Sequence, residues 1–253
     1  GSVETGIIID SAAAKNVVPC VLELGGKSAA IVHNDANLDA FESDVRWGIF
    51  FNAGQVCSAM SRVIAHESIH DELVGRIEKI AKRLDVGPGI DRPEFGENMG
   101  AMVSEAQRDR AAQMVTDAVA QGANVVTGGR KLNIPGAFLE PTILTNVTPD
   151  MTIANEEVFG PVLSVLKFKS DAQSIEIANG TPYGLVAGVF TRDINRATNA
   201  ARSLRAGQVF VNEWYAGGVE TPFGGYGLSG YGREKGREAL WNYVQTKNIA
   251  IKL

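Results

Sequence analysis

Short apolar runs alternate along this chain with amphipathic stretches that repeat at the helical period. The alternation is typical of parallel strands joined by crossover helices, because parallel neighbours cannot be connected by a tight turn. It predicts an α/β fold with a mostly parallel sheet flanked by helices. The predicted strands are residues 17–22, 29–33, 62–66, 162–168, 187–191 and 208–212.

Two amphipathic helices are predicted between these strands. Residues 69–84 repeat apolar side chains along one face, and residues 104–121 begin at Ser104, a favourable N-terminal cap. Segments rich in Gly, Pro and Asn predict loops at residues 87–100, 128–136 and 216–232. The last loop is long enough to have a functional role.

Charge and cysteine content exclude several classes of protein. The 29 acidic and 24 basic residues are dispersed, so no basic stripe is available for nucleic acid or a membrane surface. No run reaches the roughly 18 apolar residues of a membrane span, and the first residues do not resemble a signal peptide. Cys20 and Cys57 predict neither a disulfide framework nor a metal site. We therefore expect a soluble, cytoplasmic protein.

Glu23 ends an apolar run and is followed by Gly25 and Gly26. A carboxylate at the carboxyl end of a strand lies where α/β sheets commonly bind ligands. The glycines permit a sharp turn and a close approach of the backbone to a ligand. A solvated glutamate beside a turn explains the same residues equally well, so this segment alone leaves both interpretations open.

Cys57 follows Gly54 in a segment that is expected to turn after a helix starting near Leu38. Backbone N–H dipoles near a partly exposed cysteine favour its thiolate, which would make Cys57 a nucleophile. The alternative is a small buried apolar side chain, the commoner fate of a free cysteine. Cys20, inside the predicted strand at 17–22, fits that alternative well.

Glu157 and Phe159 precede a Gly-Pro turn that leads into the predicted strand at 162–168. A carboxylate is suited to binding the two hydroxyls of a ribose, and an aromatic ring offers a flat face to a nicotinamide. Taken alone, the segment is explained as well by a solvated acidic turn with Phe159 packed in the core.

In this order the three segments resemble the motifs of the aldehyde dehydrogenase family. Residues 22–28 are similar to the family's glutamate motif and residues 54–57 to its cysteine motif, and the 34-residue step from Glu23 to Cys57 matches the usual separation. The resemblance covers essentially the whole chain. Gly227 departs from it, because the family usually carries a lysine at that position. Further matches are Pro222-Phe223-Gly224-Gly225, Ser229-Gly230 and Gly232-Arg233-Glu234.

The resemblance implies oxidation of an aldehyde with NAD or NADP. Cys57 would attack the aldehyde and carry the resulting thioester, and Glu23 would activate the water that hydrolyses it. The residues implied at the cofactor are Gly1, Ser2, Leu24, Glu157 and Phe159. The residues implied at the substrate are Phe51, Trp214, Tyr215 and Phe223, each of which also fits ordinary core packing when considered alone.

The resemblance also implies a division into domains. Residues 1–22 look like the last helix and strand of a Rossmann-like cofactor domain, residues 23–241 like the catalytic domain, and residues 242–253 like an oligomerisation strand. A helix at 3–15 with Ser2 as its cap would present N–H groups to a pyrophosphate. Earlier cofactor-domain strands are missing from this sequence, so we expect the isolated chain to be inactive.

Two other classes of function are considered. A non-catalytic structural or interaction module is consistent with the alternating residues 242–253, which are typical of an edge strand that pairs with a second subunit in a dimer or tetramer. A cysteine hydrolase is disfavoured, because His33, His66 and His70 lie outside the three motif segments.

Overall fold

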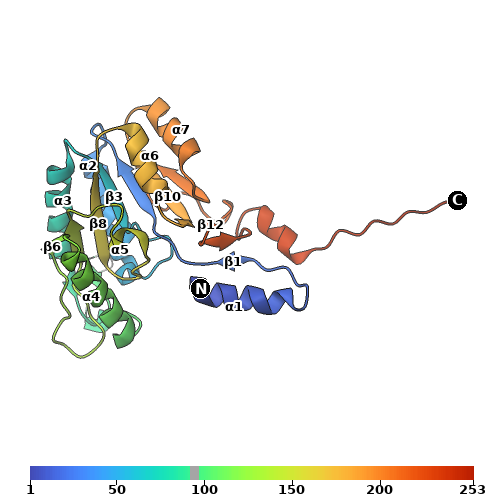
Figure 1. Cartoon of the computed structure of the whole chain (residues 1–253), viewed down its shortest axis with the longest axis horizontal. Coiled ribbons are helices and arrows are strands. Elements are labelled where there is room, and N and C mark those ends of the chain that lie inside the picture. Colours follow the sequence, from blue (N-terminus) through green and yellow to red (C-terminus); the bar gives the residue numbers. More distant parts are fainter. Residues whose placement is uncertain (92–96) are drawn as a thin grey trace.

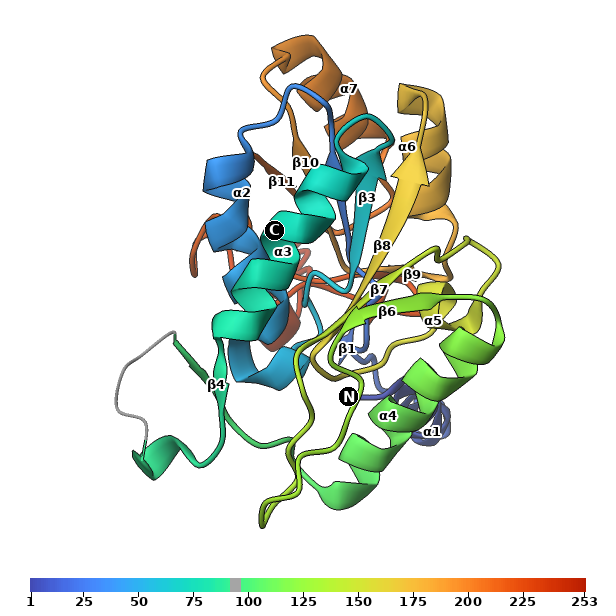
Figure 2. The ribbon, with the colours of Figure 1, turned by 90° about the vertical axis from the view of Figure 1, so that its left-hand side faces the viewer.

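The computed structural model describes residues 1–91 and 97–253, which form a seven-stranded sheet with helices on both faces (Figures 1 and 2). The strands of this sheet are β2 (Ala29–Val32), β3 (Arg62–His66), β6 (Asn124–Thr127), β7 (Thr142–Thr145), β8 (Val162–Phe168), β10 (Val186–Phe190) and β11 (Gln208–Val211). Their order is β11-β10-β2-β3-β8-β7-β6, and all neighbours run parallel except β6 and β7. The predicted α/β class is confirmed.

Five of the six predicted strands lie within one residue of the observed bounds. They were recognisable because parallel strands covered on both faces are nearly continuous apolar runs. β6 and β7 were missed. Residues of β6 remain partly exposed at the edge of the sheet, and both strands are only four residues long, so their apolar pattern is weak.

The helices cover the sheet as the crossover pattern requires. They are α1 (Val3–Ala14), α2 (Leu38–Val45), α3 (His70–Arg83), α4 (Glu105–Ala120), α5 (Thr152–Asn155), α6 (Asp171–Asn179) and α7 (Ile194–Ser203). α6 and α7 pack on β2, β8, β10 and β11, whereas α3 packs on β3, β6 and β7 and is flanked by α2 (Figure 2). The predicted caps Ser2 and Ser104 are confirmed, since each side-chain oxygen accepts a hydrogen bond from the first turn of its helix.

Short elements complete the described chain. The two-stranded pairs are β1 (Leu22–Glu23) with β13 (Gly230–Tyr231), β9 (Tyr183–Gly184) with β12 (Tyr226–Gly227), and β4 (Asp85–Val86) with β5 (Asn98–Met99). Single helical turns lie at Arg46–Phe50, Phe51–Gly54, Gly89–Asp91 and Glu238–Tyr243. The predicted loop at 87–100 includes residues 92–96, which lie outside the described residues. Within the two described ranges, no helix has the length and apolar character needed to cross a membrane.

The three motif segments meet at the amino-terminal edge of the sheet. Gly25 and Gly26 precede β2, Cys57 precedes β3, and Glu157 precedes β8. Because β2, β3 and β8 are parallel neighbours, the segments that lead into them lie side by side. The sequence-based placement of the glutamate segment at a carboxyl end was therefore wrong: Glu23 lies in β1, outside the main sheet.

Arg62 joins this edge of the sheet to α6. Its guanidinium donates from Nε to the Lys27 carbonyl at 3.0 Å, and from the two terminal nitrogens to the carbonyls of Ile177 and Ala178 at 2.9 and 2.8 Å. Arg62 is 3% exposed, and burial lowers the pKa of its guanidinium to about 10. The side chain therefore remains charged at neutral pH and satisfies carbonyls at the negative end of a helix.

The two ends of the chain differ from the predictions. The predicted strand at 17–22 is wrong apart from Leu22: residues 17–21 are irregular, and Cys20 is half-buried in this segment. Its β-branched residues mimic a strand but have no partner strand among the described residues. Residues 244–253 form no strand within the chain and extend away from the body (Figure 1). Pairing of residues 242–253 with a second subunit therefore stays a prediction.

Candidate active site

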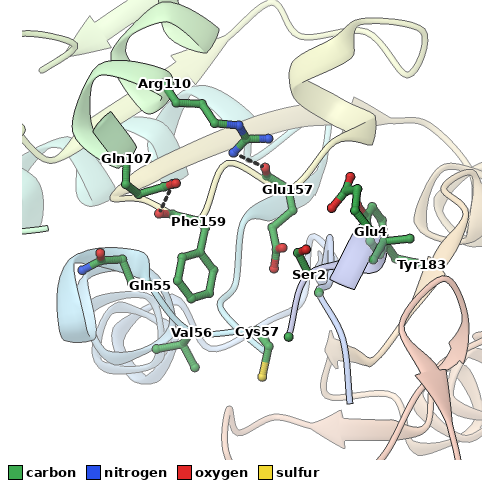
Figure 3. A pocket seen from close by; sticks show the side chains of 13 residues that line it. Ser2, Glu4, Gln55, Val56, Cys57, Gln107, Arg110, Glu157, Phe159 and Tyr183 are labelled. Atoms are coloured by element: carbon green, nitrogen blue, oxygen red, sulfur yellow. Dashed lines mark hydrogen bonds between the residues drawn. The ribbon is translucent and has the colours of Figure 1, made fainter. Parts of the chain in front are cut away.

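A cavity of about 920 Å³ lies where the motif segments meet (Figure 3). It brings together Cys57, Glu157, Phe159, Gly1 and Ser2, all predicted to be functional. In Figure 3, Phe159 and Glu157 lie between Cys57 on one side and the side chains from α4 on the other. The remaining lining residues are Val3, Glu4, Gly25, Gln55, Val56, Gln107, Arg110 and Tyr183.

Glu157 is held against the glycine pair. Its Oε1 accepts a hydrogen bond from the Gly26 N–H at 3.0 Å. A Cβ on Gly25 would lie 2.3 Å from Glu157 Oε2, and one on Gly26 would lie 2.5 Å from the Cys57 carbonyl oxygen. The absence of a side chain at Gly25 and Gly26 therefore leaves room for the Glu157 carboxylate and the Cys57 carbonyl. Burial raises the pKa of Glu157, while the Gly26 hydrogen bond and the charge of Lys27 oppose the shift.

Gly25→Ala is expected to displace the Glu157 carboxylate and to lower the free energy of unfolding by about 1–3 kcal/mol, since the added methyl overpacks a filled site. Urea denaturation measures the effect. Gly75→Ala in α3 is the matched control: a Cβ there meets nothing within 4 Å, and the substitution should stabilise the helix by about 1 kcal/mol. Adding Glu157→Ala should recover most of the Gly25→Ala loss, and strict additivity would contradict the predicted clash.

Two side chains of α4 fix the backbone of the Glu157 segment. Arg110 donates from Nη1 to the carbonyls of Glu157 and Val158 at 3.1 and 3.3 Å, and Gln107 donates from Nε2 to those of Val158 and Phe159 at 2.9 and 3.0 Å. Phe159 has a φ of 53°, a left-handed conformation that costs energy for a side chain of this size. The α4 side chains therefore stabilise a strained residue that faces the cavity.

The segment before Cys57 is a left-handed turn. Asn52, Ala53 and Gly54 have φ values of 50°, 53° and 70°. A Cβ on Gly54 would lie 2.1 Å from the Gly160 carbonyl oxygen, so the cysteine and glutamate segments are in direct backbone contact. The predicted turn near Gly54 is thereby confirmed, together with the reason for a glycine there.

The surroundings of Cys57 favour the neutral thiol. Burial raises the pKa of Cys57, and the charges of Glu23 and Glu157 raise it further, whereas the Ser58 and Cys57 N–H groups lower it. The sequence-based expectation of a thiolate stabilised by backbone dipoles is therefore wrong for this state of the chain. The dipoles are present, but desolvation and two carboxylates outweigh them.

Glu23 carries a carboxylate with neither oxygen hydrogen-bonded among the described residues. Burial raises its pKa to about 7, and Glu234 adds to the shift, whereas Arg233 and the N-terminal ammonium oppose it. Glu23 is near enough to perturb Cys57 electrostatically, although it does not line the cavity. A half-ionised carboxylate at neutral pH is suited to accept a proton from water.

α1 borders the cavity with its N-terminus. Leu24, predicted at the cofactor, lies beneath this helix: a Cβ on Gly6 would be 2.7 Å from its Cδ2. The Gly1 ammonium donates to the Glu23 carbonyl at 2.7 Å, and Ser2 Oγ accepts from the Thr5 N–H. Leu24 therefore positions α1 and does not itself line the cavity.

Comparison with known proteins decides the family. The family model described as "Aldehyde dehydrogenase family" matches residues 1–249. The chain belongs to this family. It is 42% identical over its whole length to aldehyde dehydrogenase, cytosolic 1, of Rattus norvegicus, and 42% identical to retinal dehydrogenase 2 of Homo sapiens. It covers 50% and 48% of those proteins, so it spans about half the length of the curated relatives it matches.

Solved aldehyde dehydrogenases share the fold. The NAD⁺ complex of aldehyde dehydrogenase from Bacillus cereus matches with a TM-score of 0.93 and 41% identity, over 97% of this chain and 49% of that one. Betaine aldehyde dehydrogenase of Staphylococcus aureus, in complex with NAD⁺, matches with a TM-score of 0.91 and 38% identity, over 96% and 48%. The predicted aldehyde dehydrogenase-like architecture is confirmed by these likenesses.

None of the four residues predicted at the aldehyde lines the large cavity. Phe51 is 46% exposed and borders a separate cavity of about 140 Å³. Trp214 is buried, Tyr215 is half-buried beside Cys57, and Phe223 packs beneath the Lys235 ammonium. Their role at the substrate stays a prediction.

The local fold explains why this member of the aldehyde dehydrogenase family has a glycine at position 227. Its φ is 58°, and a Cβ would lie 2.4 Å from the Pro182 carbonyl oxygen. A lysine at this position would therefore require β9 and β12 to shift.

In the described ranges, no group of three His, Cys, Asp or Glu side chains has the geometry of a metal site.

Proposed function

We propose that this chain carries the catalytic centre of an NAD(P)-dependent aldehyde dehydrogenase, with Cys57 as nucleophile and Glu23 as general base. The arrangement of Cys57, Glu157 and Phe159 around one cavity supports the proposal most directly. The perturbed, unpaired carboxylate of Glu23 near the thiol is a second support.

The cavity fits a nicotinamide nucleoside. The Glu157 carboxylate, anchored through Oε1 to Gly26, is suited to bind ribose hydroxyls, and the Phe159 ring offers an apolar face. Gln107 and Arg110 would keep both residues in place through the hydrogen bonds to their carbonyls. Bound NAD⁺ or NADP⁺ supplies a hydride acceptor. At the N-terminus of α1, Ser2 and the adjacent Glu4 already engage N–H groups, so pyrophosphate binding there stays a prediction.

The chain's own residues account for the remaining chemistry. The Cys57 sulfur adds to the aldehyde carbon, and its own N–H is one donor for the oxygen that becomes negative. After oxidation, the acyl group stays on Cys57 as a thioester. Glu23 takes a proton from water, which attacks the acyl carbon and releases the carboxylic acid and the free thiol. We also propose that residues 1–253 alone are inactive, or oxidise aldehydes only slowly.

Glu23→Gln is expected to increase the alkylation rate of Cys57 by iodoacetamide at pH 8.5 by about two- to fivefold. Removing a neighbouring negative charge lowers the pKa of Cys57 and enlarges its thiolate fraction. Peptide mass spectrometry follows Cys57 and Cys20 in the same sample, so Cys20 is an internal reference. Glu176→Gln, an exposed change on α6, is the control. An unchanged or slower rate in Glu23→Gln would show that the two groups do not interact.

We also propose a homo-oligomer formed in the cytoplasm through the C-terminal segment. Trp241 and Tyr243, in the last helical turn, are 72% and 86% exposed, and Ile249 and Ile251, in the extended segment after it, are 74% and 79% exposed. Apolar side chains gathered near one end of the chain are typical of an interface. Sedimentation of the chain before and after removal of residues 242–253 tests this: loss of a dimer or tetramer on removal is expected.

A further inference from the structure

A histidine is buried at the carboxyl-terminal edge of the sheet, opposite the edge where the motif segments meet. His33 follows β2 and is 1% exposed, and its Nε2 has no hydrogen-bond partner among the described residues. Its Nδ1 lies 3.6 Å from Asp171 Oδ1, beyond the reach of a hydrogen bond. A neutral imidazole has one N–H, whereas an imidazolium has two, and each needs an acceptor when it is buried. The site offers a charged ring one carboxylate and leaves its second N–H without an acceptor.

The His33 ring packs on Phe168, the last residue of β8. The two rings meet edge to face, with centroids 5.2 Å apart. A second imidazole, that of His66, packs on the same phenyl ring in the same way, at 5.3 Å. His66 is only half-buried, and its Nδ1 lies 2.8 Å from Ser68 Oγ. The chain therefore contains a matched pair of histidines, which share one ring contact but differ in their access to water.

The turn between β8 and α6 covers one side of His33. Phe168 and Asp171 lie at its two ends, and residues 169–173 are exposed to solvent. Asp171 also binds α7, because Arg196 donates from Nε to Asp171 Oδ2 at 3.1 Å. Since the turn lies at the surface, its displacement would admit water to His33 while the strands of the sheet stay paired.

Charged and titratable groups on four neighbouring segments act on His33. They are Asp171 on α6, Arg196 on α7, Asp35 in the turn after β2 and His66 at the end of β3. Burial lowers the pKa of His33 below its usual value of 6.5, and the charges of Arg196 and His66 lower it further. The carboxylates of Asp171 and Asp35 oppose the shift, but desolvation is the largest effect. The closed site therefore holds a neutral imidazole.

We propose that His33 is an acid-sensitive latch: its neutral ring keeps the turn between β8 and α6 closed, and uptake of a proton by His33 opens residues 169–174. Above about pH 6.5 the ring is neutral in both forms, so pH has no effect on the opening. Below that pH the opened form takes up a proton that the closed form excludes, so opening increases as the pH falls. Arg62 binds the carbonyls of Ile177 and Ala178, which confines the opening to the first turns of α6.

Hydrogen exchange of the chain between about pH 7.5 and about pH 5.5 tests the latch. Peptide mass spectrometry follows the amides of residues 169–176, and the rates are corrected for the pH dependence of chemical exchange. In wild type, opening should be about five- to tenfold more frequent at the lower pH, as for one proton taken up by a group whose pKa in water is about 6.5. The amides of α4, a helix without histidine, should stay protected at both pH values, because the opening is local.

Three variants identify the group that takes up the proton. His33→Gln keeps a polar side chain that does not titrate, so its opening should change by less than about twofold between the two pH values. His66→Gln is the matched control and should keep the pH dependence of wild type, because it alters only the other imidazole on Phe168. Asp171→Asn should open more often at both pH values, since α6 loses its ion pair with Arg196, and should still respond to pH.

A measurement on wild type needs no substitution at His33. The chain has three histidines, so the imidazole NMR signal of His33 is assigned as the one that remains in both His66→Gln and His70→Gln. In wild type this signal should titrate below pH 6.5, because the closed form excludes the proton. Thermal unfolding of each variant verifies that the fold is retained.

Four results would overturn the latch. Exchange of residues 169–176 that does not depend on pH in wild type, or a pH dependence that survives in His33→Gln, would show that His33 does not control the turn. Loss of the pH dependence in Asp171→Asn would make Asp171 the group that takes up the proton. Exchange of α4 at the same rate as residues 169–176 would mean that the chain unfolds as a whole. The latch does not depend on the proposed catalytic roles, since His33 lies at the opposite edge of the sheet.

Discussion

Arg62→Met is expected to lower the free energy of unfolding by about 4 kcal/mol. The substitution removes a buried cation with its three hydrogen bonds, and the carbonyls of Lys27 and Ala178 lose the donor that Arg62 provides, whereas the Ile177 carbonyl keeps the Gly180 N–H at 3.3 Å. For a chain of this size that loss corresponds to a decrease in Tm of about 10 °C. Differential scanning calorimetry and urea denaturation measure both quantities.

Two further variants make the Arg62 test specific. Arg62→Lys keeps the charge but loses the three-way geometry of the guanidinium, so its stability should fall between those of wild type and Arg62→Met. Arg202→Met removes an exposed arginine in the last turn of α7 and should cost less than about 0.5 kcal/mol. A free energy of unfolding of Arg62→Met within 1 kcal/mol of wild type would contradict the prediction, because it would mean that water hydrogen-bonds to these carbonyls as well as the guanidinium does.

Glu23→Gln should slow hydrolysis of an acyl group on Cys57 by about 10²- to 10⁴-fold, the usual contribution of a general base. p-Nitrophenyl acetate acylates the thiol directly, and the amount of acetyl-Cys57 over time is read by peptide mass spectrometry. The base form of Glu23 is required and its pKa is raised to about 7. In wild type, the hydrolysis rate should therefore rise with pH and level off above about 7.

Glu234→Gln tests whether ionisation of Glu23 sets the pH dependence of hydrolysis. The Glu234 charge raises the pKa of Glu23, so its removal should move the inflection of the pH profile to lower pH without abolishing hydrolysis. If acetyl-Cys57 hydrolyses equally fast in wild type and Glu23→Gln, another group activates the water and the assignment of Glu23 is wrong.

The sequence predicted those parts of the structure that depend on neighbouring residues. β3 and β8 consist mostly of apolar residues, and Ser2 and Ser104 are caps of the helices that follow them. The strand predicted at 17–22 was wrong for the same reason. A local run of β-branched residues forms a strand only where a partner strand pairs with it, and of these residues only Leu22 is paired.

Contacts between distant segments were not predictable from the sequence. Gln107 and Arg110 lie one helical turn apart on α4. That spacing is equally typical of a solvated helix face, so the sequence does not show that both side chains hydrogen-bond to a loop 47 to 52 residues away. The burial of Arg62 depends on carbonyls 115 and 116 residues further along the chain. The pKa of Cys57 likewise depends on Glu23 and Glu157, which only the folded sheet brings near it.

The meeting of the motif segments at the amino-terminal edge of the sheet bears on the order of events during folding. The hydrogen bond between Gly26 and Glu157 spans 131 residues, so it forms only after β8 has joined β3. Contacts of such long range form slowly, because a large loop must close first. During synthesis, Cys57 is therefore an ordinary exposed thiol until more than a hundred later residues have emerged and folded. Oxidants and electrophiles in the cell are expected to reach it most easily in that interval, before the cavity exists to select what enters.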